Sequence, residues 1–414
     1  MRSYFILFIS LSISMCSSVD AFAFYGLFAS KSSALPQNKA TKMVLVRHHN
    51  KTVLSLMNDF EGDLKDFALI LPVPQTFKKN NIRVIEPELF NHIDAYSSPR
   101  FIEYTDSDPC RFYAMGGSSQ NLKTFGVSVE TKTTVGEYDL TLLSAKQSLG
   151  LEAWLIKKGY AVSKDLQSAL EPFVQKKMKF LVAKVNLQEQ AKTGLQTLRP
   201  LQITFESEKF ELPIAIHSQS TQDLLLYIIT EKGRVETTNV PTAKIPSNFA
   251  LPESVKDSAA DFYPALFKTT VENEKKPSVF MEYFWNMGTC DGCTAEPLSS
   301  QELKKLGVSW LKPELAHAAP QSQSPGALPA EPQHLISAYL TRLHLRSSGE
   351  GMPETLTFQE SPDVQYFQGR YTIRHTWKGE PTECEGAKRY LDGIAKRKKT
   401  EVENLTHLTG WPPK

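Results

Sequence analysis

Short apolar runs and alternating segments recur along most of the chain, and this pattern limits the possible folds more than any other feature. FALILPV (67–73) and LLLYII (224–229) have the length and composition of buried strands. FGVSVETKTTVGEYDLTLLS (125–144) alternates apolar and polar residues, as strands do when one face lies in water. Residues 41–57 carry two apolar runs around a His-His-Asn-Lys stretch, which predicts a β-hairpin.

Helical signals are fewer. Residues 163–177 have an apolar stripe at helical spacing, and Pro172 within them is expected to end or kink the helix. Residues 299–302 (Ser-Ser-Gln-Glu) match a capping box, and Gly307 would close the short helix that they open. A longer helix is predicted from about 387 to 408 at the end of the chain.

Together these patterns predict an α+β fold that is rich in β-structure. The strand-like runs between 179 and 239 are spaced as in an antiparallel meander rather than as repeated βαβ units. We therefore expect mainly antiparallel sheets in two packed lobes, with a few helices and a C-terminal helix.

The first 23 residues have the features of a secretory signal peptide. Arg2 is followed by an apolar stretch at 4–15, which is too short to span a bilayer. The Ala-Phe-Ala sequence at 21–23 supplies a small-x-small cleavage pattern and places the mature start at Phe24. An uncleaved anchor is the alternative, and the short apolar stretch argues against it.

A lipid anchor on Cys16 is a second alternative, but Met15 is larger than the residue that normally precedes a lipidated cysteine. No later apolar run approaches the length of a membrane span. We therefore expect a mature chain with no integral membrane segment, soluble in the periplasm or outside the cell.

Composition shifts divide the chain into five predicted parts. Pro, Ala, Gln and Ser dominate 312–333, as in a flexible linker or surface insertion. The predicted parts are a signal peptide (1–23), an N-terminal β-rich lobe with two helices (24–190), a second β-rich lobe (191–311), the linker or insertion (312–333), and C-terminal strands and a helix that pack back on the body (334–414).

Charge and motifs give no support to nucleic-acid binding or to a particular reaction. The formal net charge of +2 gives no electrostatic basis for nucleic-acid binding. The sequence contains no G-x-S-x-G elbow, H-E-x-x-H motif, P-loop or G-x-G-x-x-G loop. These absences do not exclude an enzyme, because site residues are often distant in sequence, but they favour a non-enzymatic protein, and no cofactor is expected. A partner in the cell envelope or outside the cell is expected, but the sequence does not identify it.

Four cysteines follow the predicted cleavage site: Cys110, Cys290, Cys293 and Cys384. An even number in an exported protein predicts disulfides, and the simplest connectivity is Cys290–Cys293 with Cys110–Cys384. In the chain-entropy model a bridge from 110 to 384 stabilises by roughly 5 kcal/mol, and the short bridge by only about 2 kcal/mol. The short pair would therefore fix a turn or perform chemistry.

The Cys290-Asp291-Gly292-Cys293 stretch has three readings. Asp-Gly is a strong turn dipeptide, which favours a structural disulfide. A redox role, with Cys290 as nucleophile and Cys293 as resolving thiol, would need a helix N-terminus close by, but the predicted cap lies near Ser299. A zinc site would need two more ligands, which Cys110 and Cys384 could supply, although an oxidising compartment favours their pairing.

Several blocks resemble an exported bacterial family known as domain of unknown function 2330. They include NKATKMVLVRHHNKTVLSLM (38–57), SSPRFIEYTDSDPC (97–110), the CDGC stretch, TRLHLR (341–346) and FQGRYTIRH (367–375). The resemblance covers nearly the whole mature chain. It implies export and a shared fold but no activity. Two departures are the absence of cysteines at 24–30 and Gly292, where relatives often have proline.

Three hypotheses follow from the sequence. The first is a non-enzymatic exported protein, held by disulfides, that binds or supports a component of the envelope. The second is a thiol–disulfide oxidoreductase that uses Cys290 and Cys293. The third is a metal-dependent protein, in which cysteine or histidine ligands distant in sequence converge.

Overall fold

The computed structural model describes residues 27–30, 37–61, 67–74, 79–110, 136–144, 148–158, 160, 164–193, 198–214, 222–289, 295–311, 337–347, 351–380 and 384–413. The predicted signal peptide (1–23) and the predicted linker (312–333) lie outside these residues. Among the helices in the described parts, none combines the length and the apolar character needed to cross a membrane.

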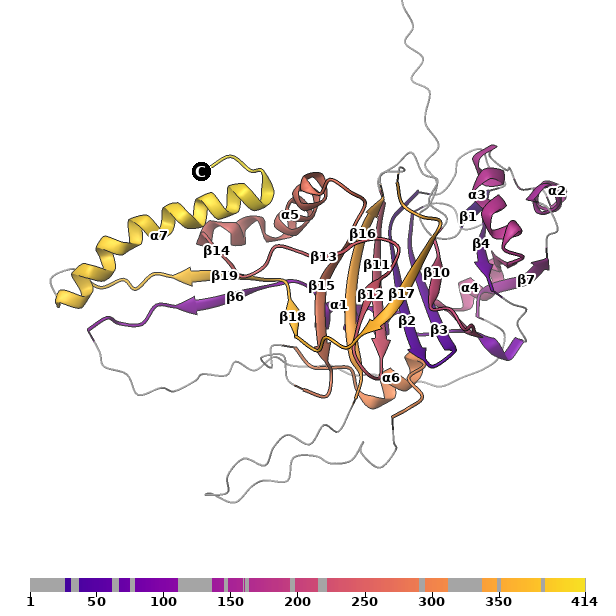
Figure 1. Cartoon of the computed structure of the whole chain (residues 1–414), viewed down its shortest axis with the longest axis horizontal. Coiled ribbons are helices and arrows are strands. Elements are labelled where there is room, and N and C mark those ends of the chain that lie inside the picture. The colour runs from indigo at the N-terminus through magenta and orange to yellow at the C-terminus, as the bar shows by residue number, and fades with distance from the viewer. Residues whose placement is uncertain are drawn as a thin grey trace, which may run out of the picture.

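A nine-stranded sheet forms the centre of the protein (Figure 1). Its strands are β2 (Gln37–His48), β3 (Lys51–Glu61), β5 (Ile82–Val84), β9 (Leu201–Glu206), β11 (Gln222–Thr230), β13 (Thr242–Lys244), β15 (Val279–Asn286), β16 (Tyr339–Ser347) and β18 (Phe367–Gln368). Their order is β13-β15-β16-β11-β2-β3-β9-β5, and β18 pairs with β15. Most neighbours are antiparallel, but β11 is parallel to β2 and β13 is parallel to β15.

Two smaller sheets cover one face of this central sheet. One contains β10 (Glu211–Pro213), β12 (Arg234–Thr237) and β17 (Thr355–Ser361), and the other contains β1 (Leu27–Ser30), β4 (Phe67–Val73), β7 (Tyr138–Ser144) and β8 (Lys179–Val185). The largest core cluster lies between the layers and joins Leu226 and Leu343 of the central sheet to Leu356 of β17 and Leu181 of β8.

Helices α2 (Ser148–Lys157) and α3 (Lys164–Gln175) cover the β4–β8 sheet on its other side, and the short α4 (Leu187–Thr193) follows β8. Pro172 was expected to end or kink its helix, and it does not end it, because α3 continues to Gln175. Proline removes one backbone hydrogen bond, but its fixed φ is compatible with a helix. Burial of Phe173 and Val174 in the adjoining core cluster offsets that loss.

The opposite face of the central sheet packs against α1 (Glu88–Ser97) and α6 (Ser300–Leu306), and the short 3₁₀ turn η2 (Lys79–Asn81) precedes β5. The predicted capping box is confirmed, since Ser299 and Glu302 exchange side-chain and backbone hydrogen bonds at the start of α6. Gly307 ends α6 in the left-handed conformation, as predicted, with φ of 111°.

A projecting arm extends from one end of the central sheet (Figure 1). It consists of an all-parallel sheet of β6 (Arg100–Thr105), β14 (Phe249–Leu251) and β19 (Arg370–His375), together with the 3₁₀ turn η3 (Glu253–Ser258), α5 (Ala259–Asn273) and α7 (Glu385–Thr409). The two helices pack on the sheet through Phe262, Leu266 and Leu408, and the predicted C-terminal helix is thereby confirmed.

The predicted hairpin at 41–57 is also confirmed: β2 and β3 pair from His48↔Lys51 through a turn in which His49 has a φ of 51°. The predicted meander between 179 and 239 is wrong. Successive strands β8 to β12 alternate between sheets, and β11 lies beside β2 and β16. Residues 226–229 of β11 are all buried, because layers cover both faces of this strand, and such a strand belongs at the centre of a sheet.

The fold class agrees with the prediction: an α+β protein, rich in mainly antiparallel sheets, with a C-terminal helix. The domain boundaries proposed near 190, 311 and 333 stay predictions. Strand β16, which follows the 312–333 segment, lies between β15 and β11 in the central sheet.

Two glycine substitutions test the local geometry. A Cβ at Gly307 would lie 2.8 Å from Val53, in a backbone conformation that alanine rarely adopts. Gly393 is inside α7, and its Cβ would meet nothing within 4 Å. We expect Gly307→Ala to lower the free energy of unfolding by at least about 1 kcal/mol, and the matched control Gly393→Ala to raise it by about 0.5–1 kcal/mol. Urea unfolding followed by circular dichroism measures both. A Gly307→Ala protein as stable as the parent would contradict the described end of α6.

Candidate functional site

The structure joins two of the four cysteines that the sequence singled out. Cys110, shortly after β6, and Cys384, at the start of α7, form a disulfide across 274 residues of sequence, with their Cα atoms 6.0 Å apart. Cys290 and Cys293 lie outside the described residues, so their pairing and their predicted redox or structural role stay predictions.

The disulfide attaches the N-terminus of α7 to the end of β6 in the arm. The sulfur of Cys384 also accepts a hydrogen bond from the backbone N–H of Ala387 at 3.2 Å, so this residue caps the helix. Asp106 adds a polar contact nearby: it accepts hydrogen bonds from Tyr390 at 2.7 Å and from Arg397 at 2.5 Å. The N-terminal half of α7 is therefore attached to the end of β6 by a disulfide and by the hydrogen bonds of Asp106.

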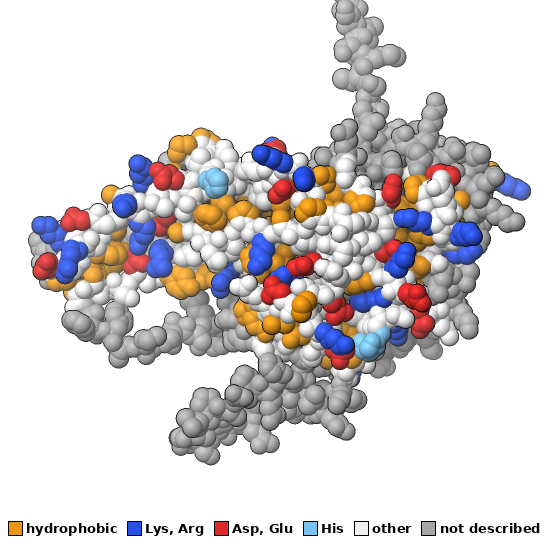
Figure 2. Space-filling model, in the orientation of Figure 1, with side chains coloured by type: hydrophobic (Ala, Val, Ile, Leu, Met, Phe, Trp, Pro, Cys, Tyr) orange, Lys and Arg blue, Asp and Glu red, His pale blue; other side chains and the backbone are white. Residues whose placement is uncertain are grey.

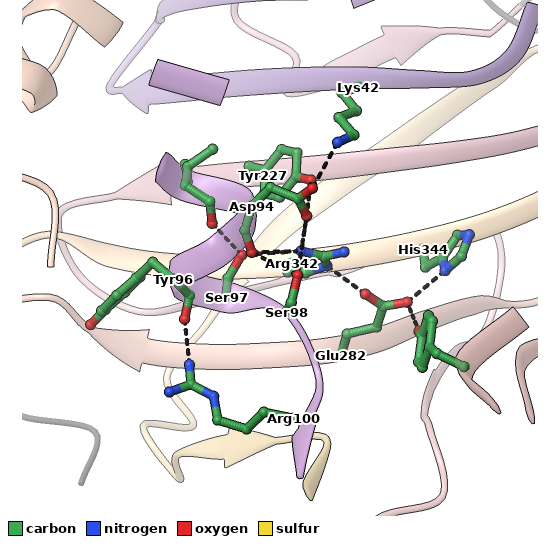
Figure 3. Close-up of polar contacts among 12 residues, drawn as sticks. Lys42, Asp94, Tyr96, Ser97, Ser98, Arg100, Tyr227, Glu282, Arg342 and His344 are labelled. Atoms are coloured by element: carbon green, nitrogen blue, oxygen red, sulfur yellow. Dashed lines mark hydrogen bonds and ion pairs between the residues drawn. The ribbon is translucent and has the colours of Figure 1, made fainter. Parts of the chain in front are cut away.

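A second feature was not predicted as a site. A row of charged or titratable side chains crosses the α1-covered face of the central sheet, and positive and negative groups alternate along it. We call it the ion-pair row, and Figure 3 shows its part from Lys42 to His344. Its members, in order, are Lys42, Asp94, Arg342, Glu282, His344, Asp223 and Arg346.

The inner contacts of the row are short. Arg342 Nε lies 2.5 Å from Glu282 Oε2, and Arg342 Nη1 lies 2.5 Å from Asp94 Oδ1. The other Glu282 oxygen lies 2.5 Å from His344 Nδ1. Lys42 Nζ closes this end at 2.7 Å from Asp94 Oδ2.

The other end of the row reaches the surface through Arg346. His344 Nε2 lies 3.7 Å from Asp223 Oδ2, and Arg346 donates to both oxygens of Asp223 at 2.7 Å. Glu282 is completely buried and the Arg342 side chain is 5% exposed, whereas the Lys42 and Arg346 side chains at the two ends are 26% and 19% exposed. The row thus passes from solvent through the core and back to solvent.

Strand geometry explains why these residues meet. Arg342, His344 and Arg346 are alternate residues of β16 and so share one face, while Leu343 and Leu345 are buried on the other. Glu282 reaches this face through a β-bulge, because the pairing of β15 with β16 shifts between Met281 and Tyr283.

The row also attaches two helices to the sheet. Asp94 belongs to α1 and accepts a hydrogen bond from Tyr227 of β11 at 2.9 Å. Tyr263 of α5 donates a short hydrogen bond to Glu282. The neighbouring Phe267 of α5 stacks on the imidazole of His344, with ring centroids 3.5 Å apart and an interplanar angle of 2°. Helix α5 of the arm is therefore anchored on the buried centre of the row.

Mutual neutralisation favours the charged forms of these buried groups. Burial alone would raise the pKa of Glu282, but Arg342 and His344 outweigh it and hold the pKa below its ordinary value. Burial acts in the same direction on Asp223, whereas Arg346 and His344 lower its pKa to about 2. For His344, burial alone would lower the pKa, but Glu282 and Asp223 raise it above its ordinary value.

The arrangement has no exposed nucleophile with a base beside it. Its carboxylates are paired with cations, and Arg342 is enclosed by acceptors. In the parts of the chain that the structure describes, no group of three or more His, Cys, Asp or Glu side chains is placed to hold a metal ion. The ion-pair row is suited to fixing α1 and α5 against the sheet rather than to acid–base chemistry.

A groove on the arm is the second candidate site. It has a volume of about 610 Å³ and lies between η3 with the start of α5 on one side and α7 with the C-terminal tail on the other. Val255 and Leu405 face it from the two sides, and Trp411, Pro412 and Pro413 line its end. Gly410 ends α7 with a φ of 69°, which turns the chain and places this tail beside the groove.

Sequence reasoning found the cysteines but missed both the row and the groove. The available signal was TRLHLR, in which basic residues alternate with leucines at period two. On a strand this pattern predicts a charged stripe opposite an apolar one. The acidic partners come from positions 94, 223 and 282, and nothing in their local sequence identifies them as partners.

Fold and site together describe a β-rich protein that is fixed by a buried ion-pair row and a long-range disulfide. Residues 19–359 match the sequence model of a protein family, domain of unknown function 2330. The family is described as an uncharacterized protein conserved in bacteria. The chain belongs to this family.

No curated protein matches the chain significantly. Among solved structures, the crystal structure of baculovirus P35 matches with a TM-score of 0.32 and 8% sequence identity, covering 79% of this chain and 98% of that one. Similarity this weak establishes neither a shared fold nor a shared activity.

Removing the central charge tests the role of the row. Glu282→Gln keeps the shape of the side chain but removes the fully buried carboxylate between Arg342 and His344, whose remaining partners Asp94 and Asp223 are each 25% exposed. We expect a loss of about 3–5 kcal/mol in the free energy of unfolding. The control is Glu403→Gln on α7, where the exposed pair with Lys399 at 3.9 Å contributes less than about 1 kcal/mol. Equal effects of the two substitutions in urea unfolding would show that the row is not a stabilising centre.

The raised pKa of His344 predicts a pH dependence. The folded protein binds this proton more tightly than the unfolded chain does, so the resulting stabilisation is complete below the ordinary pKa of about 6.5 and is lost as pH rises through the folded-state pKa. We expect the stability difference between the parent and His344→Asn to shrink from pH 6 to pH 9. Contributions common to both proteins cancel, including the raised pKa of His375. A difference that grows with pH would contradict the assignment.

Proposed function

We propose that this chain is an exported, non-enzymatic protein of the bacterial cell envelope that acts by binding, and that the arm is the part that contacts its partner. The observation that carries the proposal is the Cys110–Cys384 disulfide, which fastens the long helix α7 to β6 of the arm. Disulfides of this kind persist in exported proteins and are rare in the cytosol. The signal-peptide features at 1–23 support the same compartment.

The distribution of charge supports a binding role rather than catalysis. The buried carboxylates of the ion-pair row are neutralised by cations and attach helices to the sheet. The arm, in contrast, projects away from the central sheet (Figure 1) and carries the groove between η3 and α7. On the face in Figure 2, acidic and basic side chains are interspersed along the arm, so no large patch of one sign marks it for nucleic acid.

A reporter fusion tests export. Alkaline phosphatase fused after Lys414 requires its own disulfides and is active only outside the cytoplasm. We expect activity from the full chain and loss of activity when residues 1–23 are deleted. In the exported fraction, mass spectrometry of non-reduced peptides should find Cys110 joined to Cys384. A cytoplasmic, fully reduced chain would overturn the proposal.

The stabilising role of the disulfide is measured separately. In the chain-entropy model the Cys110→Ser/Cys384→Ser protein should unfold with a free energy lower by roughly 5 kcal/mol than the oxidised parent. Reduction of the parent should reproduce most of this loss. Mass spectrometry of alkylated peptides across a glutathione redox series shows at which potential Cys290 and Cys293 become reduced. If that pair opens reversibly at a mild potential while Cys110–Cys384 stays closed, the thiol–disulfide function replaces the binding function.

A further inference from the structure

We propose that the groove between η3 and α7 binds a peptide segment of a partner protein in which a lysine or arginine side chain stands beside apolar residues. The inference rests on the proposed binding role of the arm and specifies the ligand. It is carried by the lining of the groove, whose described residues combine an apolar surface with two carboxylates and include no lysine or arginine.

The negative charge comes from one wall. Asp257 of η3 and Asp261 in the first turn of α5 both line the groove, while the described lining contains no lysine or arginine. Two charged residues of η3 form ion pairs with residues outside the groove: Lys256 pairs with Glu103 at 2.8 Å, and Glu253 lies 2.8 Å from His375. A cation in the groove would therefore meet two carboxylates without competition from a lining cation.

Most of the apolar surface comes from the other wall and the tail. Val402 and Leu405 of α7 line the groove beside the indole of Trp411. Indole rings attract ammonium and guanidinium groups through cation–π contact and also pack against apolar side chains. Ser254, Ser258 and Thr406 add hydroxyl groups that can bond to a peptide backbone.

Size favours a peptide over a small amine. A volume of about 610 Å³ is in the middle of the range of ligand sites. A small amine would satisfy the carboxylates of Asp257 and Asp261 but leave the apolar wall and Pro412 and Pro413 in water. An extended segment with one basic and several apolar side chains would cover both walls at once.

The test uses fluorescence polarisation on the full mature chain with a labelled, end-capped hexapeptide that alternates lysine with leucine and proline. The matched probe replaces each lysine with glutamate. We expect saturable binding of the lysine probe, at least about tenfold weaker binding of the glutamate probe, and affinity that falls as salt rises. Asp257→Asn/Asp261→Asn should weaken the lysine probe about tenfold. The control Asp392→Asn, an exposed position of α7 outside the groove, should leave it unchanged.

Four outcomes would overturn the inference. The first three are equal binding of the two probes, equal affinities of the groove variant and the control variant, and no binding of either probe up to millimolar concentration. Spermidine that competes as well as the lysine peptide would identify a small organic cation as the ligand and also overturn it. Each of these leaves the phosphatase and disulfide results intact. Failure of the proposed function would instead show as a reduced chain retained in the cytoplasm.

Discussion

The carboxylate of Glu282 is enclosed by Arg342, His344 and Tyr263 at the centre of the protein. A buried carboxylate of this kind persists only when its charge is matched by well-placed donors, because desolvation of an unpaired charge costs several kcal/mol. The donors come from β16 and α5, and the row continues through Asp94 of α1 and Asp223 of β11. The positions of two helices relative to the central sheet therefore depend on one buried charge.

This dependence explains how the arm is attached at two levels. At its base, Tyr263 and Phe267 join α5 to the ion-pair row. Farther out, the Cys110–Cys384 disulfide and the contacts of Asp106 hold α7 over the arm sheet. An all-parallel sheet of three short strands is a weak unit by itself, and two packed helices supply most of its apolar contacts. The groove between η3 and α7 is shaped by the same elements, so its geometry depends on both attachments.

Features set by neighbouring residues could be predicted from the sequence. The β2–β3 hairpin, the Ser299–Glu302 capping box and the end of α6 at Gly307 each depend on a few adjacent residues, and all three are confirmed. Features set by distant residues could not. The layer of each strand between 179 and 239 depends on pairing across the whole chain, and the meander prediction was wrong for that reason.

The candidate sites follow the same rule. The bulge that turns Glu282 toward Arg342 leaves no mark in VFMEYFWN, which reads as a regular buried strand. The walls of the groove come from residues near 255 and 405, so no local sequence motif predicts the groove. Cysteines are an exception, because each has few possible partners, and the long pairing could be proposed before the fold was known.

The most direct test of the account is hydrogen exchange, read by mass spectrometry, of the Glu282→Gln protein against its parent under native conditions. If Glu282 fixes the two helices, backbone amides of α1 and α5 should show the largest increase in exchange rate in the variant. Amides of β4 and β8, in the sheet of β1, β4, β7 and β8, should be accelerated less, because they report only the overall loss of stability. Equal acceleration over the whole chain, or unchanged exchange in α1 and α5, would contradict the claim that this one charge positions them.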